Sequence, residues 1–246
     1  MAASRSSPRG RDVAAILDRL EAQHPNAFTE LNFRTPFELL VATILSAQCT
    51  DRRVNDVTPG LFARYPDARA LAAVEPETLE PIVQPTGFFR MKSRSLVGMA
   101  RALVELHGGK VPAEMDALVK LPGVGRKTAN VVLGHALGVP GLPVDRHVLR
   151  VANRLGIAHG DDAVAVEKQL TSVLLPARWT QASDTLILHG RRICRPKPLC
   201  DRCAARDLCA YFRRLGAKAA PRTTRKAKPR GVSAPNARRT RRPKAK

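Results

Sequence analysis

Four cysteines near the end of the folded region form the densest group of metal-binding side chains in the sequence. Cys194, Cys200, Cys203 and Cys209 fall within sixteen residues and are separated by five, two and five others. Four thiolates at such short spacing can hold either a tetrahedral Zn²⁺ ion or a [4Fe–4S] cluster, and spacing alone does not discriminate between them. Because no secretory signal precedes them, they predict a ligand set and not a disulfide framework. Cys49 stands apart and is expected to be an inert core thiol.

A glycine-rich turn at residues 121–125 is the second feature with chemical potential. Its sequence, Leu-Pro-Gly-Val-Gly, lies between two segments of helical character and is typical of a helix-hairpin-helix. Glycines there let a phosphate approach backbone amides at a helix N-terminus, which grips DNA without reading its sequence. A plain αα-hairpin with a Pro-Gly turn has the same local pattern. The residues expected to contact DNA here are Leu121, Gly123, Val124, Gly125 and Arg126.

Lys127 follows this turn directly, and Asp145 lies eighteen residues later. A surface lysine is usually a solvated charge, and an aspartate before a helix is usually a cap. Together with the hairpin and the four cysteines, however, these residues resemble the endonuclease III family of helix-hairpin-helix DNA glycosylases. The resemblance extends over residues 12–212 and includes Ser-Ala-Gln at 46–48, Leu-Pro-Gly-Val-Gly-Arg-Lys-Thr-Ala-Asn at 121–130 and His-Gly-Arg at 189–191.

The resemblance implies a bifunctional DNA glycosylase and lyase of base excision repair. Lys127 would attack the sugar C1′ as the damaged base leaves, and β-elimination from the Schiff base would nick the strand 3′ to the abasic site. Asp145 would activate the nucleophile and stabilise positive charge on the sugar. A neutral amine is required, and partial burial beside a cation such as Arg126 is the physical route to one. The resemblance also favours [4Fe–4S] over zinc, and oxidised pyrimidines in duplex DNA as substrates.

Two other functions remain open from the residues. A glycosylase for mismatched uracil or thymine is the nearest enzymatic alternative, and a non-catalytic DNA-binding module is the alternative from another class. Relatives of the adenine-mismatch type typically lack a lysine at the position of Lys127 and carry a second C-terminal domain. The presence of both Lys127 and Asp145 favours the lyase.

Extrusion of a stacked base requires side chains that fill the gap in the duplex. By resemblance these are Gln48 and Phe88, although Gln48 could simply end a helix and Phe88 could be core. Phe88 and Phe89 lie in a turn-rich segment where both are not easily buried, so an exposed Phe88 would suit a wedge. Other expected DNA contacts are Arg146, His147 and Arg192, the last on a basic surface around the cysteines, whereas capping or packing is an equally good role for His147.

Two departures from the family pattern concern the sites themselves. Val119 stands where relatives often carry an acidic residue, close to the hairpin. The gap between Cys194 and Cys200 is five residues where six are usual, so this loop must be tighter and the stability of the cluster is in question.

Helical periodicity dominates the elements that must position these residues, and no segment alternates like a strand. Val13, Ile16, Leu17 and Leu20 follow Asp12, a plausible N-cap, and Thr-Pro-Phe-Glu at 35–38 begins an almost wholly apolar, buried helix over 36–45. Further helices are expected over 51–64, 67–74, 76–83, 92–107, 113–119, 125–137, 145–154, 162–175 and 181–190. The fold class is all-α.

We expect two helical lobes with a DNA-binding cleft between them. A multi-helix domain over 29–139 would contain the hairpin, and a second lobe would combine the N-terminal segment 1–28 with the cluster region 140–212. Lys127 and Asp145 would then face each other across the cleft.

Positive charge is concentrated at the C-terminal end of the chain. Residues 213–246 carry fourteen Lys or Arg and no acid, so subtracting them from the net charge of +21 leaves +7 for the rest. Such a tail cannot bury enough apolar surface to order itself and is predicted to be disordered. The charge favours a nucleic-acid partner, here double-stranded DNA with damaged bases or abasic sites. We expect a monomer in the cytoplasm, associated with the nucleoid and without membrane contact, although a Ser- and Arg-rich start leaves an organelle-targeting segment open.

Overall fold

The computed structural model describes residues 10–219, and helices are the only regular secondary structure in that part of the chain. The all-α prediction is therefore confirmed. Residues 1–9 and most of the predicted basic tail, 220–246, lie outside the described residues. The α-helices are α1 (Gly10–Gln23), α2 (Pro36–Leu45), α3 (Asp51–Arg64), α4 (Ala68–Ala72), α5 (Pro76–Val83), α6 (Phe89–His107), α7 (Met115–Leu118), α8 (Arg126–Ala136), α9 (Arg146–Leu155), α10 (Ala163–Thr171), α11 (Trp179–Arg192) and α12 (Ala210–Ala219). Short 3-10 helices η1 (Gln84–Thr86), η2 (Pro176–Arg178) and η3 (Cys200–Arg202) join them.

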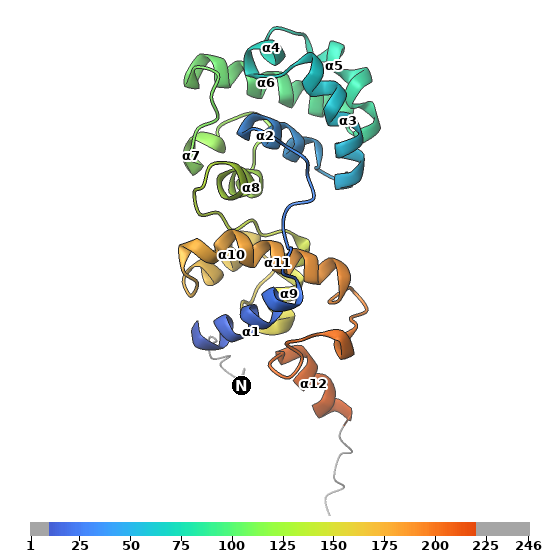
Figure 1. The fold of residues 1–246 in the computed structure, drawn as a ribbon, viewed down its shortest axis with the longest axis vertical. Coiled ribbons are helices and arrows are strands. Elements are labelled where there is room, and N and C mark those ends of the chain that lie inside the picture. Colours follow the sequence, from blue (N-terminus) through green and yellow to red (C-terminus); the bar gives the residue numbers. More distant parts are fainter. Residues whose placement is uncertain (1–9, 220–246) are drawn as a thin grey trace, which may run out of the picture.

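Two separate apolar cores divide these helices into two lobes stacked along the long axis (Figure 1). The first core is built from residues between Leu31 and Leu133, and we call α2 to α8 the hairpin lobe. The second core combines α1 with residues between Leu142 and Cys209, and we call α1 and α9 to α12 the cysteine lobe. The N-terminal helix thus packs with the C-terminal third of the chain.

Helix α2 forms the centre of the hairpin lobe. Thr35 caps it by accepting a hydrogen bond from the Glu38 amide (3.1 Å), and Pro36 takes the first position, where its missing N–H is not needed. Every residue from Leu39 to Leu45 is buried, so the helix presents an apolar surface all round, as its sequence predicts.

Several helix ends differ from the expected ones. Helix α1 begins at Gly10, so Asp12 lies in its first turn and is not the N-cap. Helix α6 begins at Phe89 and not at 92, and α10 ends at Thr171, short of the extended residue before Pro176. The expected end of the folded region at 212 falls inside α12, where Tyr211 and Phe212 pack on the second core.

The lobes meet where α8 packs against α11. Gly134 of α8 makes this approach possible, because a Cβ at that position would lie 2.3 Å from the Thr180 Oγ1. Two ion pairs cross the same junction: Arg126 with Glu167 (2.7 Å) and His135 with Asp184 (2.8 Å). The junction is therefore fixed by both close helix packing and paired charges.

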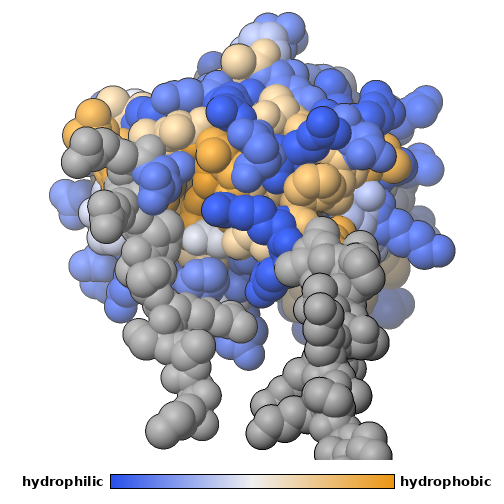
Figure 2. All heavy atoms as spheres, turned by 90° about the horizontal axis from the view of Figure 1, so that it is seen from below, coloured by the Kyte–Doolittle hydropathy of each residue, from blue (hydrophilic) through white to orange (hydrophobic). Residues whose placement is uncertain are grey.

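No helix of the part that the structure describes is long and apolar enough to cross a membrane. Viewed from the end of the cysteine lobe, most of the visible surface is hydrophilic, with an apolar area near its middle (Figure 2).

Candidate active site

Lys127 and Asp145 come together at the junction of the lobes. Both line a cavity of about 80 Å³, which we call the junction cavity, and both also line a more open groove of about 690 Å³ beside it, which we call the outer groove. The two residues belong to different lobes and to helices separated by an extended segment. The structure therefore brings Lys127 and Asp145 together between the two lobes.

The hairpin sets the position of Lys127 at the second residue of α8. Gly123 has φ +76°, and a Cβ there would lie 2.7 Å from the Ser95 Cβ, so the turn requires glycine for both conformation and space. Gly125 is the N-cap of α8 and supplies no side-chain cap. The first amides of α8 are consequently available to an anion at the positive end of the helix.

Asp145 is both the N-cap of α9 and a wall of the cavity. Its Oδ1 accepts hydrogen bonds from the amides of His147 (2.7 Å) and Val148 (2.9 Å). Since both capping bonds use Oδ1, the carboxylate is held rigidly while Oδ2 remains available. The cap and the proposed catalytic group are thus the same side chain, and the two interpretations of this residue do not compete.

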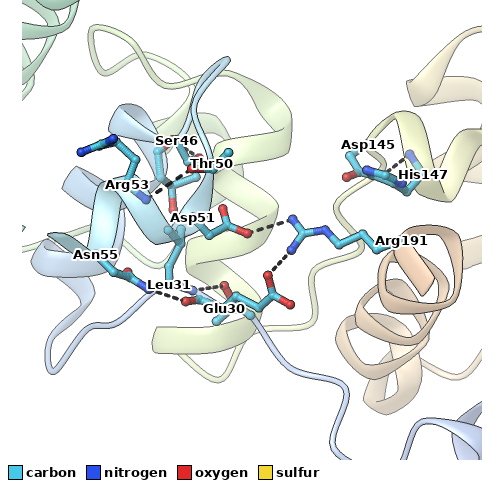
Figure 3. Close-up of polar contacts among 12 residues, drawn as sticks. Glu30, Leu31, Ser46, Thr50, Asp51, Arg53, Asn55, Asp145, His147 and Arg191 are labelled. Carbon is cyan, nitrogen blue, oxygen red and sulfur yellow. Dashed lines mark hydrogen bonds and ion pairs between the residues drawn. The ribbon is translucent and has the colours of Figure 1, made fainter. Parts of the chain in front are cut away.

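Arg191 of α11 spans the site from the cysteine lobe to the hairpin lobe (Figure 3). It donates to Asp51 Oδ2 at 2.8 Å, at the start of α3, and also pairs with Glu30 in the segment between α1 and α2. Asp145 and His147 lie on the Arg191 side of this bridge. The bridge places a guanidinium that is already paired with carboxylates in the wall of both the junction cavity and the outer groove.

A buried His135–Asp184 pair forms another wall of the junction cavity, with side chains 1% and 5% exposed. Burial opposes protonation of His135, but the hydrogen bond and the charge of Asp184 outweigh it, so the pKa of His135 is raised. Phe28, which is 59% exposed, meets the His135 ring edge-on at 5.1 Å between centroids. The cavity therefore offers one exposed aromatic face above a charged pair.

His147 lines the outer groove beside Arg146. Arg150 approaches His147 Nδ1 at 3.1 Å, and because arginine can only donate, Nδ1 must accept and the ring proton must be on Nε2. Burial lowers the pKa of His147, and the surrounding arginines act in the same direction against Asp145. His147 is thus a neutral hydrogen-bonding group at neutral pH.

Gln48 and Phe88 occupy two exposed turns of the hairpin lobe, and Gln48 lines the outer groove with Lys127. Phe88 is 57% exposed while Phe89 packs against the core, as the turn-rich sequence predicts. Gln48 and Phe88 are the two non-glycine residues with positive φ in the described part of the chain, at +52° and +49°. Such left-handed backbone costs on the order of 1 kcal/mol or more and needs support from its surroundings.

Four predicted contact residues have other surroundings than expected. Leu121 and Val124 are 3% and 6% exposed in the first core, so they can reach DNA only through their backbone. The Arg126 guanidinium forms three hydrogen bonds to Glu167, so its charge is already paired, and Lys127 is exposed where partial burial was expected. Arg192 is exposed but lines neither the junction cavity nor the outer groove.

The four cysteines line one small cavity at the far end of the cysteine lobe, with free thiols. Burial raises the pKa of the Cys203 thiol to about 11, and the neighbouring cysteines act in the same direction. A cationic centre would reverse this by stabilising thiolates. Within residues 10–219 no group of three or more Cys, His, Asp or Glu side chains is placed to hold a metal ion. Four thiols around a shared space are donors of the kind that either one zinc ion or a [4Fe–4S] cluster takes.

Arg154 of α9 holds the short loop between the first two cysteines. It donates to the carbonyls of Arg195 (2.6 Å) and Pro196 (2.9 Å), and its Nη1 lies 3.6 Å from Cys194 Sγ. These bonds satisfy carbonyls that the tight loop would otherwise leave free. The loop between Cys194 and Cys200, whose shortness raised the question of cluster stability, is thus held in place by Arg154.

The site contains residues that the sequence pattern did not single out as functional: Glu30, Asp51, His135, Asp184 and Arg191. Asp51 had the appearance of an ordinary acid in the first turn of a helix. A signal did exist for His135, because residues 127, 131 and 135 fall within one narrow face of α8. Partners from distant segments leave no such local pattern.

Comparisons with known proteins agree with this geometry. The family model described as "HhH-GPD superfamily base excision DNA repair protein" matches residues 41–176. Endonuclease III of Synechocystis is 47% identical over 203 residues, which cover 82% of this chain and 91% of the relative. Endonuclease III of Escherichia coli K12 is 42% identical over 197 residues, or 80% and 93%.

Solved structures are similar over the same region. A trapped endonuclease III–DNA covalent intermediate superposes with a TM-score of 0.80 at 39% identity, covering 85% of this chain and 99% of that one. A thermostable thymine-DNA glycosylase superposes with a TM-score of 0.76 at 21% identity, which shows a common fold alone.

Proposed function

The chain belongs to the endonuclease III family, within the HhH-GPD superfamily of base excision DNA repair proteins, and from this premise we propose that it excises oxidised pyrimidines from duplex DNA and nicks the strand through Lys127. Membership makes it a DNA glycosylase, with the lyase step typical of the family. The observation that supports the residue assignment is that Lys127 and Asp145, from different lobes, line the same cavity and groove.

The proposed reaction starts with attack of the neutral Lys127 Nζ on the sugar C1′. The C1′–N bond to the base breaks and its electron pair leaves with the base, which takes up the proton that Lys127 gives up. Oδ2 of Asp145 faces the positive charge that develops on the sugar, while Oδ1 remains bound to the α9 amides. Loss of the sugar oxygen at C1′ opens the ring to the imine, and removal of a C2′ proton then expels the 3′ phosphate.

DNA would be held by backbone amides and basic side chains around the site. The uncapped N-terminus of α8 suits a phosphate, and Arg146 and His147 line the groove next to it. Gln48 and Phe88 are exposed where they could fill the gap left by an extruded base. All these groups come from one chain, so a monomer acting on chromosomal DNA in the nucleoid suffices.

The cysteines would hold a [4Fe–4S] cluster whose role is to shape the DNA-facing surface of the cysteine lobe, with no part in bond breaking. His189 links the cysteines to α1. Its Nε2 lies 3.6 Å from Cys203 Sγ, and its Nδ1 lies 3.1 Å from His24 Nε2. Burial and the charge of His24 lower the pKa of His189 to about 4, so the ring is neutral and can donate one hydrogen bond.

Borohydride trapping tests the proposed chemistry directly. The wild type should form a covalent adduct on a duplex with one oxidised pyrimidine, and Lys127→Ala should form none. Lys110→Ala, which removes an exposed lysine that lines neither the cavity nor the groove, is the matched control and should trap like the wild type. Parallel duplexes with mismatched uracil or thymine separate the substrate classes, since faster trapping on them would replace the proposed substrate. Tight binding without base release by the wild type would leave a binding module.

A further inference from the structure

Lys92, in the first turn of α6, carries a buried ammonium group that the reaction itself does not use. The residue is 2% exposed, and its Nζ donates to the carbonyls of Leu45 (2.8 Å) and Thr86 (2.7 Å). No carboxylate pairs with it within residues 10–219. Leu45 ends α2 and Thr86 ends η1, so the cation lies where both helices have unpaired carbonyls.

The two carbonyls belong to the two turns that carry the exposed Gln48 and Phe88. Leu45 is three residues before Gln48, and Thr86 is two residues before Phe88. These are the same two residues that adopt left-handed backbone, at φ +52° and +49°. A non-glycine residue keeps that conformation only where its surroundings impose it. The Lys92 ammonium, which is bonded to both turns, provides a constraint of this kind. It also links two turns that are forty residues apart in the sequence.

Helix α6 connects these turns to the hairpin as well. Ser95 lies against Gly123, and Gly98 packs on Pro122, where an added Cβ would be 3.3 Å from the proline ring. Residues 92, 95 and 98 of one helix therefore touch all three hairpin-lobe elements proposed to contact DNA. Helix α6 therefore sets the spacing between the Gln48 turn, the Phe88 turn and the hairpin.

Stability alone does not account for a lysine at this place. Burial lowers the pKa of Lys92, against the opposing effect of Cys49, so keeping the group charged works against the fold. A buried charge can often be replaced by an apolar side chain of similar volume without loss of stability. The directional bonds to two carbonyls are what an apolar side chain could not supply.

We propose that Lys92 is a positioning residue that fixes the separation and backbone conformation of the Gln48 and Phe88 turns, so that both side chains enter the duplex together while the base leaves the stack. The inference rests on the proposed function, because it assumes that these side chains fill the gap. It predicts a specific defect: Lys92 matters for extruding a base from an intact stack, and much less once the base is already unpaired.

The test compares Lys92→Met with the wild type in single-turnover base excision. One duplex carries the oxidised pyrimidine in a normal pair, and a second carries it opposite an abasic gap, where extrusion costs less. Misplaced gap-filling side chains should slow excision from the paired duplex about tenfold or more and from the gapped duplex only about twofold. Arg101→Met is the matched control, because Arg101 is another α6 cation that donates to carbonyls, those of Ala72 and Val74, away from the site.

Two further measurements keep the result independent of overall folding. Amide hydrogen exchange in the turns at 46–50 and 86–90 should rise in Lys92→Met and not in Arg101→Met. In a background of Gln48→Ala and Phe88→Ala, the added Lys92→Met change should cost almost nothing more, because its targets are gone. If Lys92→Met does not fold, Lys92→Arg replaces it, since the larger guanidinium keeps the charge but alters the spacing.

Equal slowing on both duplexes, or no change on either, would overturn the proposal. So would full additivity with the Gln48 and Phe88 substitutions. A failure of the proposed function looks different, because then the wild type itself would release no base from either duplex and trap no adduct.

Discussion

The two lobes of this protein are held together in different ways. In the hairpin lobe, α2 is buried on every side and one large apolar core reaches from Leu31 to Leu133. In the cysteine lobe, polar side chains bind backbone carbonyls or distant acids at many points. Arg154 holds the 195–196 carbonyls, Arg178 pairs with Asp18 and Glu21, and Gln23 bonds the chain at 202 and 204.

The two lobes therefore illustrate two kinds of stabilising interaction, apolar packing and directional polar bonds. An apolar core depends on the pattern of side chains and tolerates small errors of geometry. The cysteine lobe adds directional bonds and four clustered thiols to an apolar core of its own, and these groups are few, so each has a large local effect. The proposed active site lies between the two lobes, with Lys127 contributed by the first and Asp145 by the second.

Among the substitutions that test this difference between the lobes, removal of a cysteine should have the largest effect. Cys203→Ala is expected to abolish the visible absorbance of the proposed cluster and to destabilise the cysteine lobe first, because a bound cluster would add its binding free energy to the folding of that lobe. Chelation of iron should act in the same way. Protease sensitivity in residues 140–212 should rise well before that in 36–133. Cys49→Ala, which removes a thiol outside the ligand set, is the control and should keep the absorbance. Simultaneous loss of both lobes would show that they are not separable.

A core truncation should affect the hairpin lobe without touching the cysteines. Leu40 is 0% exposed at the centre of α2, so Leu40→Ala should lower the free energy of unfolding by roughly 2–5 kcal/mol through the lost contacts and the cavity. Denaturant unfolding measures this, with absorbance confirming an intact cluster. Leu106→Ala, at a leucine 66% exposed in the same lobe, should change stability by less than about 0.5 kcal/mol. Similar losses at both positions would contradict the description of a single dominant core.

Arg154 offers a smaller and more local change. Arg154→Met leaves the carbonyls of two exposed loop residues without their donor, so water replaces it and the loop loses a link to α9 at a cost of about 1 kcal/mol. The expected result is faster bleaching of the cluster by oxygen or chelator, with unchanged unfolding of the hairpin lobe. Arg206→Met serves as control, since Arg206 also lines the cysteine cavity but pairs only with an exposed Asp201. Identical bleaching rates in all three proteins would show that the loop does not need this support.

Features that depend on local sequence signals could be predicted from the sequence, whereas contacts between distant residues could not. The helices over 51–64 and 76–83 were predicted at their observed bounds and the central helix at its observed start, Pro36, because caps, prolines and apolar periodicity are local signals. The hairpin and the cysteines were found by spacing. The bridges through Arg191, His135 and Lys92 were not, because the partners of each residue are distant in sequence and leave no local pattern. Helix α12 was missed because its polar composition outweighed two aromatic residues that pack on the second core.

The smallest expected effect concerns the pair that joins the lobes. Because the pKa of His135 is raised in the folded state, its stabilising contribution is complete below its ordinary value of 6.5 and is lost as the pH rises through the raised value. The stability difference between the wild type and His135→Gln should therefore shrink as the pH rises above the ordinary histidine value of about 6.5. Denaturant midpoints measured across that range test this, and subtraction of the two curves removes the titration of the other histidines. His107→Gln, at the end of α6 and outside the junction, should track the wild type at every pH. A difference that grew with pH would mean that the histidine is buried neutral and that the lobes are joined by packing of α8 on α11 without a charge pair.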